Sequence, residues 1–529
     1  MVSDLGSGMG HVSIVVIVYN DASRIVSAVE SALAQGPEVG EVIVVDDCST
    51  DGTVDALAPL AAEPRLRIIA RETNSGGCGT PRNDGMAAAA FPYVMFLDSD
   101  DILPPRAIGT LLPIAEERRA DVVAGQCLRV ELPDGATTVW APLLYDRSAG
   151  AELPGTVIEG IENTPRMLWD TLSVNKLYRR AFLEKHSITF PHGAFHYEDF
   201  VFTARVYAAD PRLAVTDEPV YLWQVRRQAA KLSISLSRGA IRNWQSRVTA
   251  HRGVVEVLRS AGREELALHA LAKFCDYDLP LYLRELPQRD REYVAEWWRI
   301  TREYLTGFDP EGIACAGVVS RWIADAILTA PEPAELGRLV ELTARPPRLI
   351  PPYDDLAAPP AGLGLLTTAE LPVAVDGRVR AGGSTRLSLR VHELYGRLAE
   401  LGPRTVTVEL EERTGGRPAV AVEAPLVPDG DGWTAGVRLS TAALACPGRL
   451  GVWSVRAEIR YADGSATPVE VRAAGTQAAR RGIVVRPTGR VLLVQTHVTG
   501  GRALVLRVAD GLQGARRVAE ARVRRLLGR

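Results

Sequence analysis

Residues 93–101 read Tyr-Val-Met-Phe-Leu-Asp-Ser-Asp-Asp, an apolar run of strand length followed at once by an acidic cluster. Ligands of open α/β sheets bind beyond the carboxyl ends of the strands, where such a cluster would lie. Asp98 and Asp100 are separated by one residue, so in a short turn their carboxylates can converge on one hard cation. Taken alone, the triplet Asp98-Ser99-Asp100 is weak evidence for a cation site, because a solvated acidic loop that caps the following helix would have the same sequence.

The sequence around this cluster alternates between apolar strands and amphipathic helices. Residues 12–18 are a β-branched run, typical of a strand that is buried on both faces. Ile25, Val29 and Leu33 recur every fourth residue and predict a helix with one apolar stripe. Further strands are predicted at 42–45, 66–70, 93–97 and 122–125. This alternation predicts an α/β domain with a mostly parallel sheet covered by helices.

A second acidic pair follows the strand predicted at 42–45. A buried carboxylate of Asp46 or Asp47 could accept the imide N–H of a uracil, which would read a nucleotide base. An Asp that only caps the next helix is the alternative.

The segment Asn74–Asn83 is a loop rich in glycine that leads into an alanine-rich helix. Gly76 and Gly77 would let the backbone approach a ligand closely, although a structural turn explains glycines equally well. Arg82 could pair with a phosphate or stack on a base. The loop is therefore a candidate part of a nucleotide site.

In this order and at these spacings, the motifs resemble glycosyltransferase family 2, inverting enzymes with the GT-A fold. The resemblance covers residues 12–236 and rests on Val15–Asn20, Val45–Thr53, Asn74–Gly85 and Leu97–Asp101. The family usually has a proline where this chain has Ile17, a change that a strand tolerates. The resemblance implies transfer of a sugar from a nucleotide-sugar, with a UDP-sugar as the expected donor and Mn²⁺ or Mg²⁺ as cofactor.

The resemblance also implies roles for individual residues. Asp100 would bind the cation directly, and Asp98 would lie on the ribose or cation side. The residues implied in nucleotide-sugar binding are Val18, Tyr19, Asn20, Asp46, Asp47, Gly76, Gly77, Arg82, Asp98, Ser99, Arg226, Arg227 and Ser233. The last three lie in a stretch that resembles the family's mobile segment over the diphosphate, for which a salt-bridged surface loop is the alternative.

An acceptor hydroxyl must lose its proton as it attacks, so the reaction needs a general base. Residues 196–200 resemble the family's Glu-Asp motif, which assigns Asp199 as the base and Glu198 as a neighbour that positions it or binds acceptor. The alternative is a charge pair that only caps a helix. Lys176 and Arg179 could touch phosphate or acceptor, or could simply be surface cations.

Composition sets limits on the classes of partner and compartment. A chain of 529 residues is long enough for about three domains. The net charge of −3 gives no attraction to nucleic acid, so no nucleic-acid partner is expected. The six cysteines show no paired spacing, so neither a zinc site nor a disulfide framework is indicated. Without a signal-like or membrane-spanning run, we expect a cytoplasmic protein whose residues 1–11 are a disordered lead-in.

Beyond residue 236 the patterns change. Helical spacing predominates over 237–345, which we expect to pack on the catalytic domain, and proline and glycine gather in a predicted linker at 346–370. Alternating patterns over 371–513 predict a β-sandwich of one or two immunoglobulin-like units. Trp433 and Trp453 could stack on sugars there, but aromatic residues on a sandwich are more often core.

This layout resembles the poly(ribitol-phosphate) sugar transferases that decorate wall teichoic acids. In those relatives the β region mediates trimerisation or binds polymer, which implies homo-oligomerisation through this region or glycan binding. The arginine-rich segment 514–529 predicts a basic helix, which could lie on the inner face of an anionic membrane. A solvated terminal helix is the alternative.

The sequence thus predicts a metal-dependent inverting glycosyltransferase acting on a hydroxyl of a cell-envelope polymer, such as a teichoic-acid-like glycan, or of a lipid-linked glycan. Two alternatives remain: an inactive polysaccharide-binding scaffold and a nucleotidyltransferase. The intact set of carboxylates disfavours the scaffold, and release of pyrophosphate would reveal the nucleotidyltransferase.

Overall fold

The computed structural model describes residues 11–227, 237–351, 353, 363, 366–381, 384–413, 420–445, 450–474, 481–485, 491–498 and 503–510. Ser233, residues 1–10 of the predicted lead-in, residues 352, 354–362, 364 and 365 of the predicted linker, and the helix predicted at 514–529 lie outside these ranges. Contacts divide the chain into two units, residues 1–344 and 345–529, which are described separately.

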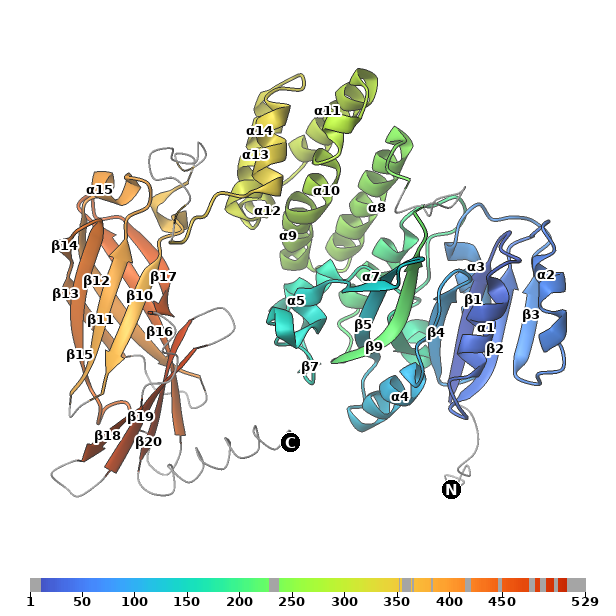
Figure 1. Ribbon diagram of the computed structural model, residues 1–529, viewed down its shortest axis with the longest axis horizontal. Helices are drawn as coiled ribbons and strands as arrows, with labels where there is room; N and C mark the ends of the chain where they lie inside the picture. The colour runs from blue at the N-terminus through green and yellow to red at the C-terminus, as the bar shows by residue number, and fades with distance from the viewer. Residues whose placement is uncertain are drawn as a thin grey trace. The chain divides into compact units, whose positions relative to one another are not determined.

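The sheet of the first unit has the strand order β3-β2-β1-β4-β8-β5-β9-β7, and β6 pairs with β5 (Figure 1). Its strands are β1 (Val12–Val18), β2 (Val39–Asp46), β3 (Leu66–Ala70), β4 (Tyr93–Asp98), β5 (Val122–Glu131), β6 (Ala136–Val139), β7 (Val157–Ile158), β8 (Lys176–Arg179) and β9 (Leu213–Val225). All of β1 is buried, as its β-branched composition predicts. The β3-β2-β1-β4 half is entirely parallel.

The parallel register brings three strand ends to one edge. Ile17 of β1 pairs with Val45 of β2 on one side and with Asp98 of β4 on the other. The residues after Val18, Asp46 and Asp98 therefore emerge side by side, although they are far apart in sequence. This edge is where the sequence places its candidate site.

The other half of the sheet is mixed. β8, which was not predicted, runs antiparallel to both β4 and β5, while β9 is parallel to β5 with a shift in register near Gln126. β9 crosses to the acidic turn after β4, where Ile102 and Leu222 form an isolated bridge. The sheet is thus parallel in the half that presents the acidic side chains.

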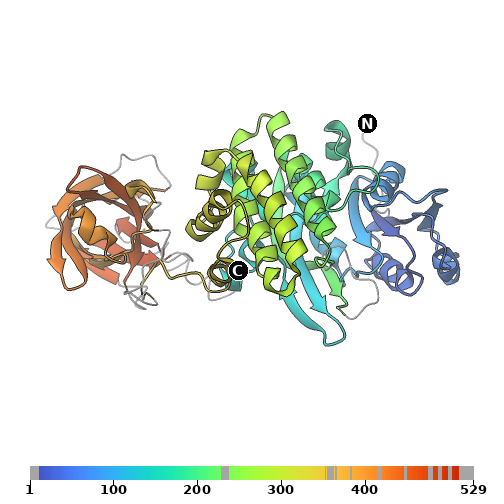
Figure 2. The ribbon, with the colours of Figure 1, turned by 90° about the horizontal axis from the view of Figure 1, so that it is seen from above.

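Helices of the first unit are α1 (Ile25–Leu33), α2 (Thr53–Ala56), α3 (Gly79–Ala88), α4 (Ala107–Glu117), α5 (Pro142–Tyr145), α6 (Arg180–Lys185), α7 (Glu198–Ala208), α8 (Ile241–Ser260), α9 (Glu264–Lys273), α10 (Leu279–Leu283), α11 (Arg291–Thr306), α12 (Pro310–Ala314), α13 (Val318–Thr329) and α14 (Leu336–Ala344). Helices α8 to α14 gather in one group beside the β5–β9 half of the sheet (Figures 1 and 2). No helix in the described residues is long and apolar enough to cross a membrane.

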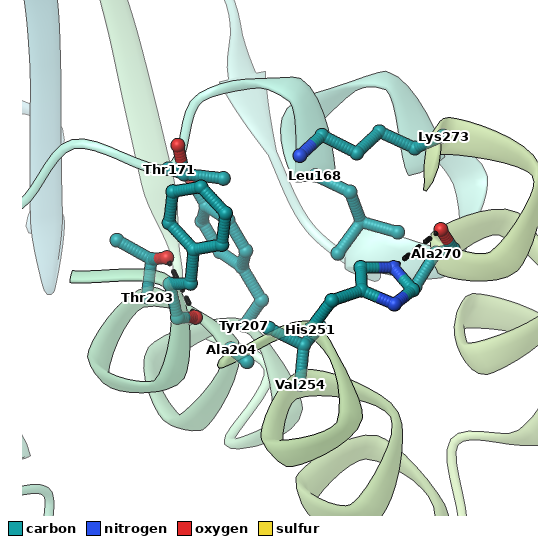
Figure 3. Close-up of a pocket in the computed structure, with 10 residues that line it drawn as sticks. Leu168, Thr171, Thr203, Ala204, Tyr207, His251, Val254, Ala270 and Lys273 are labelled. Carbon is teal, nitrogen blue, oxygen red and sulfur yellow. Dashed lines mark hydrogen bonds between the residues drawn. The ribbon is translucent and has the colours of Figure 1, made fainter. Parts of the chain in front are cut away.

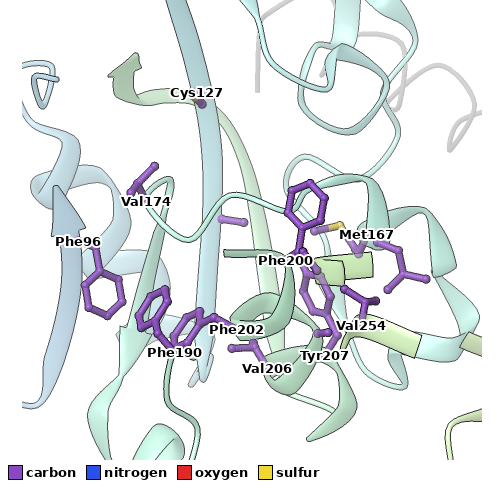
Figure 4. Packing of buried hydrophobic residues seen from close by; sticks show 14 of the residues in the cluster. Phe96, Cys127, Met167, Val174, Phe190, Phe200, Phe202, Val206, Tyr207 and Val254 are labelled. Atoms are coloured by element: carbon purple, nitrogen blue, oxygen red, sulfur yellow. The ribbon is translucent and has the colours of Figure 1, made fainter. Parts of the chain in front are cut away.

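An aromatic cluster joins β4 to the start of α7 (Figure 4). The rings of Phe190 and Phe202 stack with centroids 3.8 Å apart, and the edge of each meets the Phe96 ring at 5.2 and 5.8 Å. All three side chains are buried. This packing fixes the segment before α7 against the strand that carries the acidic turn.

A small cavity of about 20 Å³ lies between α7, α8 and α9 (Figure 3). Its lining is mostly apolar, and its volume admits no more than about one water molecule. A pocket for a ligand of drug size measures roughly 300–1,000 Å³. The cavity is therefore not the site of a nucleotide-sugar.

The second unit is rich in β-strands: β10 (Val375–Arg380), β11 (Ser384–His392), β12 (Pro403–Glu412), β13 (Val420–Pro425), β14 (Val427–Asp429), β15 (Gly432–Ser440), β16 (Leu450–Tyr461), β17 (Ala466–Ala473), β18 (Arg481–Val485), β19 (Val491–Val498) and β20 (Leu504–Asp510), with the short helix α15 (Arg397–Leu401). Burial alternates along β11, as in a sheet with one covered face. Hydrogen bonds connect the strands in the order β14-β15-β11-β10-β17-β16-β20-β19-β18, and β12 pairs with both β16 and β13.

Trp453 is buried and donates to the carbonyl of Leu444, so it belongs to the core. The predicted succession of α/β domain, helices and β-rich region is confirmed.

His251 on α8 gives a test of this packing. The side chain is buried, Nε2 donates to the Ala270 carbonyl at 2.9 Å, and Nδ1 accepts from the Tyr304 hydroxyl at 2.6 Å. Burial lowers the pKa of His251 from 6.5 to about 4. The unfolded chain therefore binds a proton between these pH values that the folded chain does not bind, so the free energy of unfolding falls as pH drops through this window.

We expect His251 to account for a loss of ~3 kcal/mol in the free energy of unfolding between pH 6.5 and pH 4. In His251→Gln this component of the pH dependence should disappear, as measured by urea unfolding with tryptophan fluorescence. His186→Gln, at an exposed position, is the control and should keep the wild-type slope. An unchanged slope in His251→Gln would contradict the prediction.

Candidate functional site

The acidic turn consists of Asp98, the last residue of β4, and the three residues that follow it, and Asp101 is its most buried member. The Asp101 carboxylate is buried and accepts from the Tyr221 hydroxyl at 2.7 Å and from the Gln224 amide at 2.8 Å. The Asp98 amide donates to the same Tyr221 hydroxyl at 3.2 Å. β9 therefore holds the acidic turn in shape, and Asp101 is a structural member of it.

Asp98 and Asp100 remain partly open, with about a third of each side chain exposed (32% and 33%). Burial, and then the like charge of Asp98, raise the pKa of Asp100 to about 6. Closely placed, partly desolvated carboxylates of this kind are hard oxygen ligands whose charge a divalent cation would offset. The residues therefore fit a cation.

Among the described residues, no group of three or more His, Cys, Asp or Glu side chains is arranged to hold a metal ion. A cation at Asp98 and Asp100 would thus take its other ligands from a bound molecule or water, as Mg²⁺ commonly does with phosphates.

Asp21 and Arg24, which sequence reasoning missed, complete this turn from the β1 side. Ser99 donates to Asp21 at 2.7 Å, and Arg24 contacts Asp21 at 2.5 Å and Asp100 at 3.3 Å. The available signal was their position within the six residues that follow the end of β1 at Val18. Ser99, predicted to bind the donor, has its hydroxyl committed to Asp21.

Arg82 of α3 joins the acidic turn to α7. Its side chain is only 2% exposed and donates to Asp98 at 2.6 Å, to Glu198 at 2.5 Å and to Asp199 at 3.0 Å. A buried guanidinium with three carboxylate partners has no open face for a phosphate. This placement favours a role in organising the carboxylates over the predicted direct contact with donor.

Glu198 and Asp199 begin α7 and differ in exposure. Glu198 is buried (8% of its side chain exposed), and burial raises its pKa to about 7 even with Arg82 beside it. Asp199 is 18% exposed, and burial raises its pKa as well. Its Oδ1 accepts from the Ser173 hydroxyl at 2.8 Å, while Oδ2 has a longer contact of 3.3 Å with the Ser173 amide. Of the two carboxylates, Asp199 is the better placed to meet a substrate.

The glycine-rich loop packs against the segment that leads into α7. A Cβ added to Gly77 would lie 2.5 Å from the Gly193 carbonyl oxygen, and one added to Gly79 would lie 2.1 Å from that of Pro191. Gly76 has a φ of 82° and faces Ala194. These glycines serve close packing between two loops, which the sequence left open as the alternative to ligand contact.

The two aspartates after β2 have different environments. The Asp47 carboxylate accepts from the Ser75 amide and hydroxyl at 3.0 and 2.8 Å and pairs with Arg71 at 2.8 Å, so it orders the loop 71–75. Asp46 accepts from the Ser49 amide at 3.0 Å, and its Oδ1 is enclosed without a partner among the described residues. A buried acceptor of this kind raises the free energy of the folded state unless a donor reaches it.

The remaining predicted residues divide into two groups. Val18 is buried at the end of β1, whereas Tyr19 is 44% exposed and Asn20 holds the loop after β2 by accepting from the Thr50 amide at 2.7 Å. Arg226 reaches the Asp100 carbonyl at 3.2 Å and so lies at the acidic turn.

Two predicted cations lie elsewhere. Nε and Nη2 of Arg227 each donate to a carboxylate oxygen of Glu131 at 3.0 Å on the exposed surface, which is the salt-bridged alternative. Lys176 is fully buried against Asp170 at 2.6 Å and cannot reach phosphate or acceptor. The acidic turn thus brings together six of the predicted residues: Asp98, Asp100, Asp199, Glu198, Arg82 and Arg226. Arg227 and Lys176 lie elsewhere.

Comparison with known proteins gives relatives for the first unit. Succinoglycan biosynthesis protein ExoO of Rhizobium meliloti is 32% identical over 215 residues, 41% of this chain and 61% of that protein. Poly(ribitol-phosphate) beta-N-acetylglucosaminyltransferase TarS of Staphylococcus aureus is 30% identical over 42% of this chain and 36% of its own length. Poly(ribitol-phosphate) beta-glucosyltransferase of Bacillus spizizenii is 28% identical over 56% of this chain and 44% of its own length. The chain spans less than two thirds of each relative.

A family model described as Glycosyl transferase family 2 matches residues 13–187. The match includes the aspartate pair after β2, the glycine-rich loop and the acidic turn, and it ends before Glu198. Residues 13–187 of this chain are therefore similar to glycosyl transferase family 2, and the α/β arrangement described above agrees with the GT-A fold.

Proposed function

We propose that this chain transfers a sugar from a nucleoside diphosphate donor to a hydroxyl of a cell-envelope polymer, with inversion at the anomeric carbon. One observation carries the proposal: Arg82 contacts Asp98 of the acidic turn and Asp199 of α7 at 2.6 and 3.0 Å. A cation-binding turn and a candidate base therefore share one partner. A single-displacement transfer needs these two functions on opposite sides of one reacting carbon.

The transfer is a direct displacement. The acceptor oxygen attacks the anomeric carbon, the bond from that carbon to the phosphate oxygen breaks, and the hydroxyl proton passes to Asp199. Asp199 suits this role because it is the more exposed member of the pair and its raised pKa increases its proton affinity. Arg82 and Ser173 hold the carboxylate in one orientation.

Asp100 and Asp98 would hold a divalent cation, Mn²⁺ or Mg²⁺, whose charge offsets the negative charge that develops on the leaving diphosphate. Arg24 and Arg226, which contact Asp100, add positive charge at the same turn. The positive charge of Arg82 has a different role, because it offsets the charges of the Asp98, Glu198 and Asp199 carboxylates and not that of the diphosphate.

The pair Asp46 and Asp47 would read the nucleotide base. Asp47 supports this indirectly by ordering the loop 71–75, and the unpartnered Oδ1 of Asp46 is an acceptor that a ligand N–H could satisfy. Tyr19 is exposed beside them and could lie against the base. A UDP-sugar is the donor that this arrangement fits best.

The acceptor class follows from the relatives. Their names concern succinoglycan and poly(ribitol-phosphate), which are both polymers rich in hydroxyl groups. We therefore propose a glycan or teichoic-acid-like acceptor at the inner face of the membrane. Oligomerisation through the second unit and peripheral membrane contact belong to the same proposal.

A donor screen tests the proposal. The purified chain is incubated with UDP- and GDP-linked sugars and cell-envelope fractions, with Mn²⁺ or with EDTA, and released nucleotide and product linkage are measured. Cation-dependent UDP release with an inverted linkage in the product supports the proposal. Release of pyrophosphate would indicate a nucleotidyltransferase, and polymer binding without nucleotide release would indicate a scaffold.

Asp199→Asn should reduce turnover by ~10²–10⁴ because the base is lost, while the affinity for UDP stays at the wild-type value. Asp217→Asn changes a surface carboxylate that pairs with Arg147, and this control should keep full activity. Wild-type turnover in Asp199→Asn would remove this residue from the role of base.

Asp100→Ala should abolish the part of the UDP affinity that depends on Mn²⁺, because the carboxylate that holds the cation is missing. Calorimetric titration of UDP with and without MnCl₂ measures this part directly. Asp134→Ala, at an exposed turn, is the matched control. A normal response of Asp100→Ala to Mn²⁺ would place the cation elsewhere.

A further inference from the structure

Helix α8 carries a buried charged group outside the segment that the family model matches. Arg247 is 7% exposed and contacts Asp278 at 2.5 Å, and Lys273 contacts the other oxygen of the same carboxylate at 2.9 Å. All three side chains are buried. Burial of three charges has a large desolvation penalty, so the arrangement needs a reason beyond stability.

The Arg247 guanidinium faces the residues on both sides of the Glu198–Asp199 pair. Its central carbon lies 5.0 Å from the centre of the Tyr197 ring and 5.1 Å from that of Phe200. The Lys273 ammonium lies 4.8 Å from the same Phe200 ring (Figure 3 shows Lys273 beside the cavity). Cations at these distances are attracted to the faces of aromatic rings.

Tyr197 has a backbone that requires such support. Its φ of 61° lies in the left-handed region, which is unfavourable for a bulky side chain. Its hydroxyl donates to Asn243 of α8 at 2.9 Å, and Asn243 is buried. Strained conformations of this kind persist where the surroundings determine them, and here α8 supplies those surroundings.

We propose that Arg247 and Asn243 form an anchor on α8 that holds Tyr197 in its left-handed conformation and thereby sets the position of Glu198 and Asp199. The anchor rests on the proposed function, since it acts through the proposed base. Arg247 touches none of the reacting groups, so it is a positioning residue. The helical segment thus positions the proposed base, although the family model does not include this segment.

Arg247→Lys tests the anchor and keeps a positive charge beside Asp278, so the buried carboxylate stays paired. Lysine lacks the planar guanidinium that lies against both rings. We expect kcat to fall ~10- to 100-fold, with the donor KM and the calorimetric affinity for UDP unchanged. Amide hydrogen exchange in residues 200–204 should accelerate, while exchange in α3 and β4 stays as in the wild type.

Arg252→Lys is the matched control. Arg252 lies on the same helix, is exposed and stacks on Tyr304 at 5.0 Å, without contact to Tyr197 or Phe200. Tyr197→Phe is a second variant that removes only the hydroxyl that reaches Asn243, and it should show the same pattern to a smaller degree.

Wild-type kcat and wild-type exchange in Arg247→Lys would overturn the anchor. Parallel loss of UDP binding and of exchange protection throughout the first unit would also overturn it, because a general structural role would then explain the residue. If the wild-type chain transfers no sugar, the proposed function fails, and exchange in residues 200–204 still decides whether the anchor exists.

Discussion

A single buried guanidinium, that of Arg82, holds the candidate site together. Asp98, Glu198 and Asp199 come from two distant parts of the chain, and without a cation between them their charges would repel one another. Conversely, burying the charge of Arg82 at 2% exposure would carry a large desolvation penalty without these partners. Each side of this cluster therefore depends on the other. Asp100 lies outside this cluster: it contacts Arg24 at 3.3 Å and, unlike the buried Asp101, keeps a third of its side chain exposed, which suits it to binding a ligand.

Much of this arrangement could be predicted from the sequence because strand ends are local features. The apolar runs before Asp46 and Asp98 predict buried parallel strands, and parallel strands bring their carboxyl ends to one edge. The pairing of Ile17 with Asp98, and of Val18 with Asp46, is the expected result. The β-rich region could be predicted as well, because the alternation of apolar and polar residues with a period of two is visible within a single strand.

The rest could not be predicted because it depends on contacts between segments far apart in the sequence. Nothing near Arg82 indicates that two of its three carboxylate partners, Glu198 and Asp199, lie more than 100 residues away, so a phosphate was the natural expectation. The glycines of the loop were ambiguous for the same reason, since Gly77 and Gly79 are explained only by the carbonyls of Gly193 and Pro191. Arg24 and Arg247 had no motif at all, and their contacts are visible only in the folded chain.

The close packing of these glycines has a mechanical consequence. Because no side chain separates the backbone of Gly77 and Gly79 from that of residues 190–195, neither segment can move toward the other without a steric clash. Thr80 accepts from the Gly193 amide at 3.0 Å, and Asn83 exchanges two hydrogen bonds with Phe190, which adds direct linkage to this contact. A displacement of residues 190–195 would therefore also move α3 and Arg82, which contacts the carboxylate of Asp98. Under the proposed function, an acceptor that displaced residues 190–195 would thereby change the position of the carboxylates that face the donor.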